Sequence, residues 1–135
     1  MTPAELIAAM EAAERGSREL SVACLEALGY KRIKMTCHRL DLGVYATVQE
    51  WVDPNGVRRW ECGKEPWFTT DLNVRLPGVP KGVWIINIGQ EGQCRAEFRA
   101  MEDVWRSNSG HEGYGRTEAL ARCIAELKAI LGERT

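Results

Sequence analysis

Residues 44–62, VYATVQEWVDPNGVRRWEC, decide how the middle of the chain folds. Residues 44–52 are rich in β-branched and aromatic side chains, which favour strands. DPNG at 53–56 is a strong turn signal, and residues 57–62 then return with a second strand pattern. We therefore predict a β-hairpin with strands at 44–52 and 57–62.

More strands are expected on both sides of this hairpin. RIKMTCHRL at residues 32–40 contains an alternating stretch, and VWIINIG with CRAEFRAM, joined by QEGQ, predicts a second hairpin over residues 83–101. Proline and glycine punctuate residues 66–82, which leave room for one helical turn around Thr70 to Val74. Residues 102–115 are polar and contain glycines, and we predict a loop there.

Helices are predicted before and after the strands. Residues 3–14 form one helix, and a second begins at its cap Ser17 and stops at Gly29; the pattern leaves open whether the two are one kinked helix. Residues 117–131 carry an apolar stripe at helical spacing, and Gly132 ends that helix. The order predicts an α+β fold, with one antiparallel sheet of four to five strands flanked by N- and C-terminal helices in an α-β-α sandwich. The prediction is one domain spanning 1–135.

Composition narrows the class of protein. The 18 lysines and arginines against 19 aspartates and glutamates disfavour binding to duplex nucleic acid. No apolar run approaches the length of a membrane span. No C-x-x-C pair and no secretory signal is present, so we expect free thiols and a cytoplasmic location. The five cysteines are Cys24, Cys37, Cys62, Cys94 and Cys123.

Enzyme and metal interpretations find little support. Of the two histidines, His111 makes a dyad with Cys37 conceivable, but no local sequence supports it. A zinc site would have to gather ligands from scattered positions, and no standard catalytic or nucleotide-binding motif occurs. We expect no catalytic residues, no metal and no cofactor.

The stretch HEGYGRTEALARC at 111–123 carries the main binding candidate. Arg116 stands at the entrance of the predicted helix, where the helix dipole favours anions and disfavours a cation. Beside it, Gly115 allows close backbone approach, Thr117 offers a hydroxyl, and Tyr114 offers a ring. This pattern predicts a phosphate seat. The alternative is an ordinary loop in which Thr117 caps the helix and Arg116 is solvated.

Further candidates come from the strands and the end of the second helix. Arg32 and Arg99 offer guanidinium groups for phosphates, although a cation at a helix end, as with Arg32, also has a structural explanation. Trp84 and Phe98 offer rings, although a tryptophan at a position like that of Trp84 is more often a core residue than a base platform. The full predicted ligand-binding set is Arg116, Thr117, Gly115, Tyr114, Arg32, Trp84, Asn87, Phe98 and Arg99.

Four pieces of the chain carry a family resemblance. GSREL, PWFTTDLN, VPKGVWI and TEALARCIAELKA follow in this order, and over residues 3–132 the chain resembles the phage ABA-sandwich domain family. The resemblance implies a sheet between helices. Some phage proteins of similar layout are Thoeris anti-defence proteins of the first kind, which sequester cyclic ADP-ribose isomers and, in some cases, cyclic oligonucleotides without cleaving them. Those proteins are homo-oligomers with pockets where protomers meet.

The resemblance and the residues lead to one functional expectation. It is a phage protein that sequesters a cyclic nucleotide immune signal as a homo-oligomer in the host cytoplasm. Arg116 and Arg32 or Arg99 would hold phosphates, and Tyr114, Trp84 or Phe98 would stack on the base. The alternative is a protein–protein interaction or assembly module whose tryptophans contact a host factor. A cryptic hydrolase is a third possibility.

Overall fold

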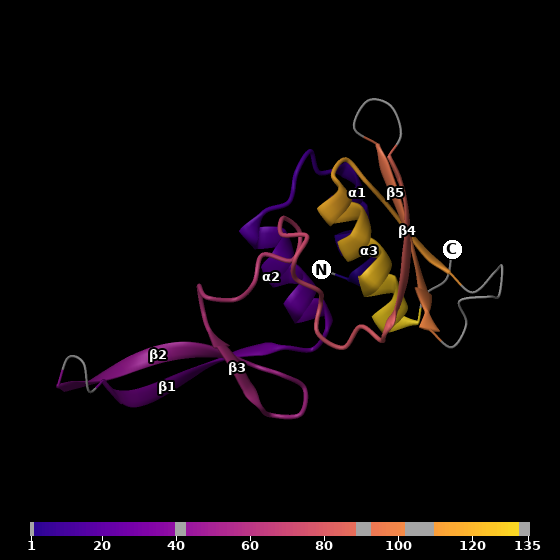
Figure 1. The fold of residues 1–135 in the computed structure, drawn as a ribbon. Coiled ribbons are helices and arrows are strands. Elements are labelled where there is room, and N and C mark those ends of the chain that lie inside the picture. Colours follow the sequence, from indigo (N-terminus) through magenta and orange to yellow (C-terminus); the bar gives the residue numbers. More distant parts are fainter. Residues whose placement is uncertain (1, 40–42, 89–92, 102–109, 133–135) are drawn as a thin grey trace. The chain divides into compact units, whose positions relative to one another are not determined.

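The computed structural model describes residues 2–39, 43–88, 93–101 and 110–132. The chain divides into two compact units. Unit 1 consists of Met1–Cys24 and Pro66–Thr135, and unit 2 is Leu25–Glu65. In chain order the elements are α1 (Pro3–Ala12), α2 (Arg18–Ala27), β1 (Lys31–Arg39), β2 (Val44–Val52), β3 (Arg58–Glu61), β4 (Gly82–Ile88), β5 (Cys94–Ala100), β6 (His111–Gly115) and α3 (Glu118–Leu131) (Figure 1).

The α+β class and the antiparallel pairing are confirmed, but the single sheet is wrong. The strands form two three-stranded sheets, β1-β2-β3 and β4-β5-β6. Residues 62–81, between β3 and β4, are too long a connection for a hairpin turn, so nothing forces β3 and β4 to pair. The predicted hairpins are both present, since β2 pairs with β3 and β4 pairs with β5 in antiparallel register.

The core of unit 1 lies between α3 and the β4-β5-β6 sheet. On β5, Cys94, Ala96 and Phe98 are buried against α3. They alternate with residues on the opposite face of the sheet, as expected for a strand. Helix α1 packs against α3 and β6, and Figure 1 places α1 and α3 on the same side of the sheet. Among the described elements of unit 1, this is a helical layer on one face rather than a sandwich.

Helix α3 follows its prediction closely. The Thr117 hydroxyl accepts a hydrogen bond from the Leu120 backbone amide at 3.1 Å, which makes Thr117 the N-cap. Gly132 ends the helix in the left-handed region, with φ of 76°. Thr117 therefore has a structural role that is independent of any ligand.

The predicted loop at 102–115 is wrong over its last five residues. These form β6, which pairs with β5 in the register Cys94↔Gly115 to Phe98↔His111. The glycines are there because α3 comes very close: a Cβ at Gly113 would lie 2.2 Å from the Ala121 carbonyl oxygen, and one at Gly115 would lie 2.9 Å from the Leu120 Cβ. They serve helix–strand packing rather than a flexible turn. Residues 102–109 lie outside the described residues.

Two further local predictions for unit 1 concern the first two helices and the segment near Thr70. Helices α1 and α2 are separate, with residues 13–17 between them. The predicted helical turn near Thr70 is not a helix; residues 67–71 form turns in which the Thr70 and Asp71 amides both donate to the Trp67 carbonyl.

Unit 2 contains the hairpin predicted at residues 44–62. Strand β2 pairs with β1 over nine positions, whereas β3 pairs only with Glu50, Trp51 and Val52. Asp53 organises the turn: its Oδ1 accepts from the Asn55 and Val57 amides at 2.9 Å, and its Oδ2 accepts from Arg59 Nε at 3.0 Å. The hydrogen bond from Val57 is the main cause that lowers the pKa of Asp53.

Candidate ligand-binding groove along helix α3

Arg116 lies where the chain passes from β6 into α3. Its side chain is 48% exposed, and its Nη1 lies 3.7 Å from Oε1 of Glu14, which is itself 86% exposed. Such a long, solvated ion pair contributes little and leaves the guanidinium accessible. Arg116 therefore keeps part of its capacity to bind an anion.

The neighbours of Arg116 are not gathered around it. Gly115 is buried in β6 against α3, and Thr117 uses its hydroxyl to cap the helix. Tyr114 alternates with Gly113 and Gly115, so its side chain is on the opposite face of the sheet. The Tyr114 hydroxyl donates to Glu112 Oε2 at 2.8 Å. The structure thus separates the predicted ring from the predicted cation.

The sheet face opposite α3 carries a network of ion pairs. Arg99 donates to both oxygens of Glu97, at 3.0 and 3.2 Å, and Glu97 is buried. Arg95 is hydrogen-bonded to Glu112, which raises the pKa of Arg95 and lowers that of Glu112. Arg99 is consequently held by an internal carboxylate in this state.

The predicted base platforms on β4 and β5 are core residues. Phe98 is fully buried and packs on Trp84, with ring centroids 5.0 Å apart and planes tilted by 54°. The Arg122 guanidinium covers the Trp84 ring at 5.5 Å from its centroid. Asn87 lies in β4 opposite Arg95, and its side chain is outside the described part of the structure.

Arg32 belongs to unit 2, on strand β1. Its guanidinium lies 3.7 Å from Glu26 and 5.3 Å from the centroid of the Trp51 ring. The Arg32 guanidinium therefore pairs with a carboxylate near the end of α2 and packs on an aromatic ring. This is a structural role, as the alternative prediction for Arg32 stated.

The predicted ligand-binding residues do not form one site, but a groove lies along α3 in unit 1. It has two parts that share Leu72 and Ala119. We call the first the N-terminal hollow; it has a volume of about 240 Å³ and lies at the start of α3. Its lining residues are Arg15, Gly16, Thr69, Thr70, Leu72, Thr117, Glu118 and Ala119.

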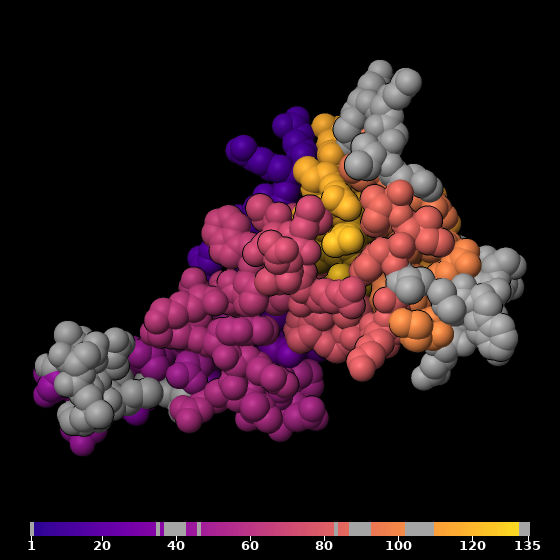
Figure 2. Space-filling model, in the orientation of Figure 1, coloured from indigo at the N-terminus to yellow at the C-terminus, as the bar shows by residue number. Residues whose placement is uncertain are grey.

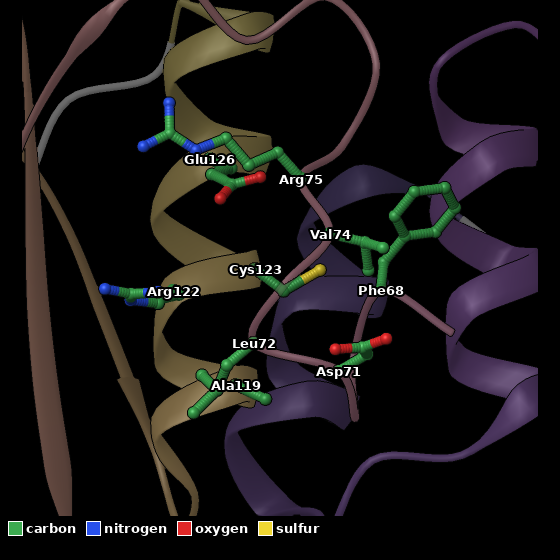
Figure 3. Close-up of a pocket in the computed structure, with 9 residues that line it drawn as sticks. All are labelled: Phe68, Asp71, Leu72, Val74, Arg75, Ala119, Arg122, Cys123 and Glu126. Atoms are coloured by element: carbon green, nitrogen blue, oxygen red, sulfur yellow. The ribbon is translucent and has the colours of Figure 1, made fainter. Parts of the chain in front are cut away.

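The second part, the Glu126 cavity, lies further along the helix (Figure 3). Its lining residues are Phe68, Asp71, Leu72, Val74, Arg75, Ala119, Arg122, Cys123 and Glu126. The free space is about 10 Å³, enough for one water-sized sphere. In Figure 3 the Arg75 side chain lies beside the Glu126 carboxylate, whereas Arg122 extends away toward the strands.

The segment that covers the groove, residues 66–76, is called the strap. Figure 2 shows α3, in yellow, visible only in part beside this pink segment. The strap is tied at Thr69, whose hydroxyl accepts from the Ser17 amide at 3.0 Å and donates to the Ser17 carbonyl at 2.9 Å. At its other end, the Leu76 amide donates to Glu126 Oε2 at 2.8 Å.

The tie at Thr69 explains two of the sequence pieces named above. Gly16 in GSREL approaches the Thr69 carbonyl so closely that a Cβ would lie 1.9 Å from its oxygen. Ser21 completes the junction, with its Oγ 2.9 Å from Thr69 Oγ1. The pieces GSREL and PWFTTDLN therefore contact one another directly.

The groove is lined by both acidic and basic side chains. Burial raises the pKa of Glu126 to about 7, against the Leu76 hydrogen bond and the nearby arginines Arg75 and Arg122, which lower it. At the N-terminal hollow, Arg15 lines the wall, and the Glu118 and Ala119 amides belong to the first turn, which has no intrahelical acceptors. The hollow thus combines a cation, the exposed Thr70 hydroxyl and helix-end amides.

Sequence reasoning missed Arg15, Thr69 and Glu126. Arg15 and Thr69 give no pattern signal, because only the folded strap brings them together. Glu126 gives one: it lies seven residues after Ala119 and three after Cys123, so a carboxylate occupies a buried helical stripe.

Replacing Thr69 with valine tests the anchor of the strap. The change removes the three side-chain contacts to Ser17 and Ser21 and leaves the half-buried Ser17 amide without its acceptor. We expect a loss of about 2 kcal/mol in the free energy of unfolding, measured with urea. Thr70→Val, at the exposed neighbour, is the control and should change stability by less than about 0.5 kcal/mol. Equal effects at the two positions would contradict the anchor.

Fold and groove together define a two-unit α+β protein with an arginine-bearing groove along α3. Comparisons with protein-family models, with curated proteins and with solved structures give no match. Among the described residues, no helix has the length and apolar character needed to cross a membrane. The described histidine, cysteine, aspartate and glutamate side chains form no group of three or more suited to a metal ion.

Proposed function

We propose that the protein binds a cyclic nucleotide signal, a cyclic ADP-ribose isomer or a cyclic oligonucleotide, and retains it without cleavage. The N-terminal hollow is the observation that carries this proposal. A phosphate there would meet the Arg15 guanidinium, the exposed hydroxyl of Thr70, and the free amides at the start of α3. Helix N-termini bind phosphates in this way because the amide donors and the helix dipole act together.

Arg116 serves the same site from its rim in this proposal. It precedes Thr117, which lines the hollow, and among the described residues it forms a long ion pair with the exposed Glu14. An incoming phosphate would replace that weak surface pair. The position of Arg116 at a helix start, unfavourable for a cation alone, becomes favourable once an anion is bound.

The size of the hollow bears on assembly. At about 240 Å³ it is smaller than the 300–1,000 Å³ that is typical of small-molecule sites. It accommodates a phosphate with its sugar, and the remainder of a cyclic nucleotide would extend outward. A second protomer that covers this remainder would complete the site, which is our reason to propose a homo-oligomer.

Calorimetric titration with a panel of cyclic ADP-ribose isomers and cyclic di- and trinucleotides tests the proposal. We expect one class of nucleotide to bind, and Arg15→Ala and Arg116→Ala each to weaken binding about 10- to 100-fold, through loss of a charge-assisted hydrogen bond. Lys128→Ala removes a positive charge from the same helix outside the groove and is the matched control. Heating the complex should release intact nucleotide, identified by chromatography and mass spectrometry.

Each contrary result has a definite meaning. Wild-type affinity in both arginine variants would show that the ligand does not bind in this hollow. Recovery of a chemically changed nucleotide after heating would show that the protein hydrolyses the ligand rather than sequestering it. Absence of heat with every nucleotide would favour the second candidate, an interaction or assembly module.

The second candidate rests on the β1–β2 hairpin of unit 2. Beyond the short strand β3, this hairpin is a two-stranded ribbon, an arrangement that is marginally stable by itself. Ile33, Val44 and Tyr45 are 38%, 51% and 76% exposed on it. Exposed apolar side chains of this kind favour a binding partner.

A further inference from the structure

Three sulfur atoms meet in the core of unit 1, one from each of its helices. Met10 is on α1, Cys24 is on α2 and Cys123 is on α3. The Sγ of Cys24 lies 3.8 Å from the Sδ of Met10 and 3.8 Å from the Sγ of Cys123. All three side chains are buried, and both cysteines are free.

The spacing of the sulfurs suits a shared metal ion. A metal–sulfur bond of about 2.3 Å, with bond angles of about 110–120°, places neighbouring sulfur ligands about 3.8–4.0 Å apart. Binding would therefore require only that the thiols lose their protons and turn toward the ion.

The donor set selects the kind of ion. Two thiolates and one thioether are soft ligands, which Cu(I) prefers, whereas zinc usually takes four ligands with nitrogen or further thiolates. Within the described residues, no third histidine, cysteine, aspartate or glutamate joins the two cysteines in a group suited to a metal. Cu(I) accepts a coordination shell of only two or three sulfur ligands, whereas zinc does not.

The proposed site borders the Glu126 cavity. Cys123, one of the two thiols, is among the residues that line this cavity beneath the strap. The hydrogen bond with Cys24, together with burial, raises the pKa of the Cys123 thiol. An incoming ion would displace both thiol protons to solvent.

We propose that Met10, Cys24 and Cys123 form a site for one Cu(I) ion per chain. This site is separate from the N-terminal hollow and does not depend on the proposed nucleotide function. It would join α1, α2 and α3 at a single point. Binding would stabilise the folded protein, because the three ligands come together only after folding.

The test is an anaerobic titration of the full chain with Cu(I), in competition with a Cu(I)-selective chelator. Cys37→Ser and Cys62→Ser are introduced first, to remove the two cysteines of unit 2. We expect one equivalent to bind, with a thiolate-to-copper band in the ultraviolet and a rise in melting temperature. Cys24→Ala and Cys123→Ala should each lower the affinity at least 100-fold, and Met10→Leu about 10-fold.

Cys94→Ala is the matched control, since Cys94 is also a buried free cysteine, but lies on β5. It should bind copper as the parent does. Copper affinity that survives in Cys24→Ala and Cys123→Ala, or that is lost equally in Cys94→Ala, would overturn the proposal. X-ray absorption of the copper-loaded parent needs no core variant: two or three sulfur ligands support the site, and a first shell of nitrogen or oxygen refutes it.

Discussion

Glu126→Gln will stabilise the protein at alkaline pH, and the gain will grow as the pH rises. Glu126 is buried beneath the strap, and its pKa is raised to about 7 by desolvation. Glutamine keeps an oxygen that can accept the Leu76 amide hydrogen bond, but it never ionises. The variant therefore avoids the cost of burying a carboxylate.

The direction follows from proton linkage. A folded-state pKa above the unfolded value of 4.5 means that the native state binds more protons than the unfolded chain between these values. Stability from this group is thus greatest below about pH 4.5 and falls as the pH rises through about 7. The shift of roughly 2.5 units corresponds to about 3 kcal/mol, of which about 2–3 kcal/mol lies between pH 5 and pH 9.

Urea unfolding of both proteins at several pH values measures this effect. Glu11→Gln removes an exposed carboxylate from α1 and should show no such pH-dependent gain. A stability difference between Glu126→Gln and the parent that stays constant from pH 5 to pH 9 would mean that Glu126 is ionised throughout. The strap would then be held by an ion pair to Arg75 or Arg122 rather than by a neutral acid.

Gly113→Ala will destabilise unit 1 by about 3 kcal/mol or more. The added methyl group would lie 2.2 Å from the Ala121 carbonyl oxygen and 2.7 Å from the Ala125 amide nitrogen. Both are backbone atoms of α3, so no side-chain rotation can relieve the clash. Overpacking of a core usually costs 1–3 kcal/mol, and a rigid backbone contact belongs at or above the upper end.

Denaturant unfolding followed by circular dichroism checks this prediction. Tyr114→Ala changes the adjacent residue on the opposite, exposed face of β6 and should cost less than about 1 kcal/mol. If Gly113→Ala were as mild as Tyr114→Ala, the close approach of β6 to α3 would be wrong. The flexible phosphate-binding turn expected from GYGRT would then regain support.

The local elements could be predicted because each has a local cause. Thr117 and Gly132 delimit α3 by capping, and Asp53 with its turn closes the β2–β3 hairpin. The number of sheets could not be predicted, because the alternating pattern of a strand does not specify which other strand it pairs with. Strand β6 was missed because glycines that permit a close contact resemble, in the sequence, glycines that permit a turn.

The candidate site was located only in part. The start of α3 was identified through Arg116 and Thr117, and the N-terminal hollow lies there. Its opposite wall comes from Arg15 and Thr69, about fifty to one hundred residues earlier in the chain, and no local pattern joins them. Phe98 and Trp84 are core residues because they lie on the buried face of their sheet. The alternation of a strand predicts that one face is buried, but it does not specify which one.

The central place of α3 also governs when unit 1 can fold during synthesis. Helix α3 supplies the surface on which α1, β5 and β6 pack, yet it follows all of them in the chain. A ribosome therefore exposes Cys94, Phe98 and Met10 before their covering helix exists. The nascent chain must keep these residues from aggregating until α3 emerges, whereas the hairpins of unit 2 can close as soon as they leave the exit tunnel.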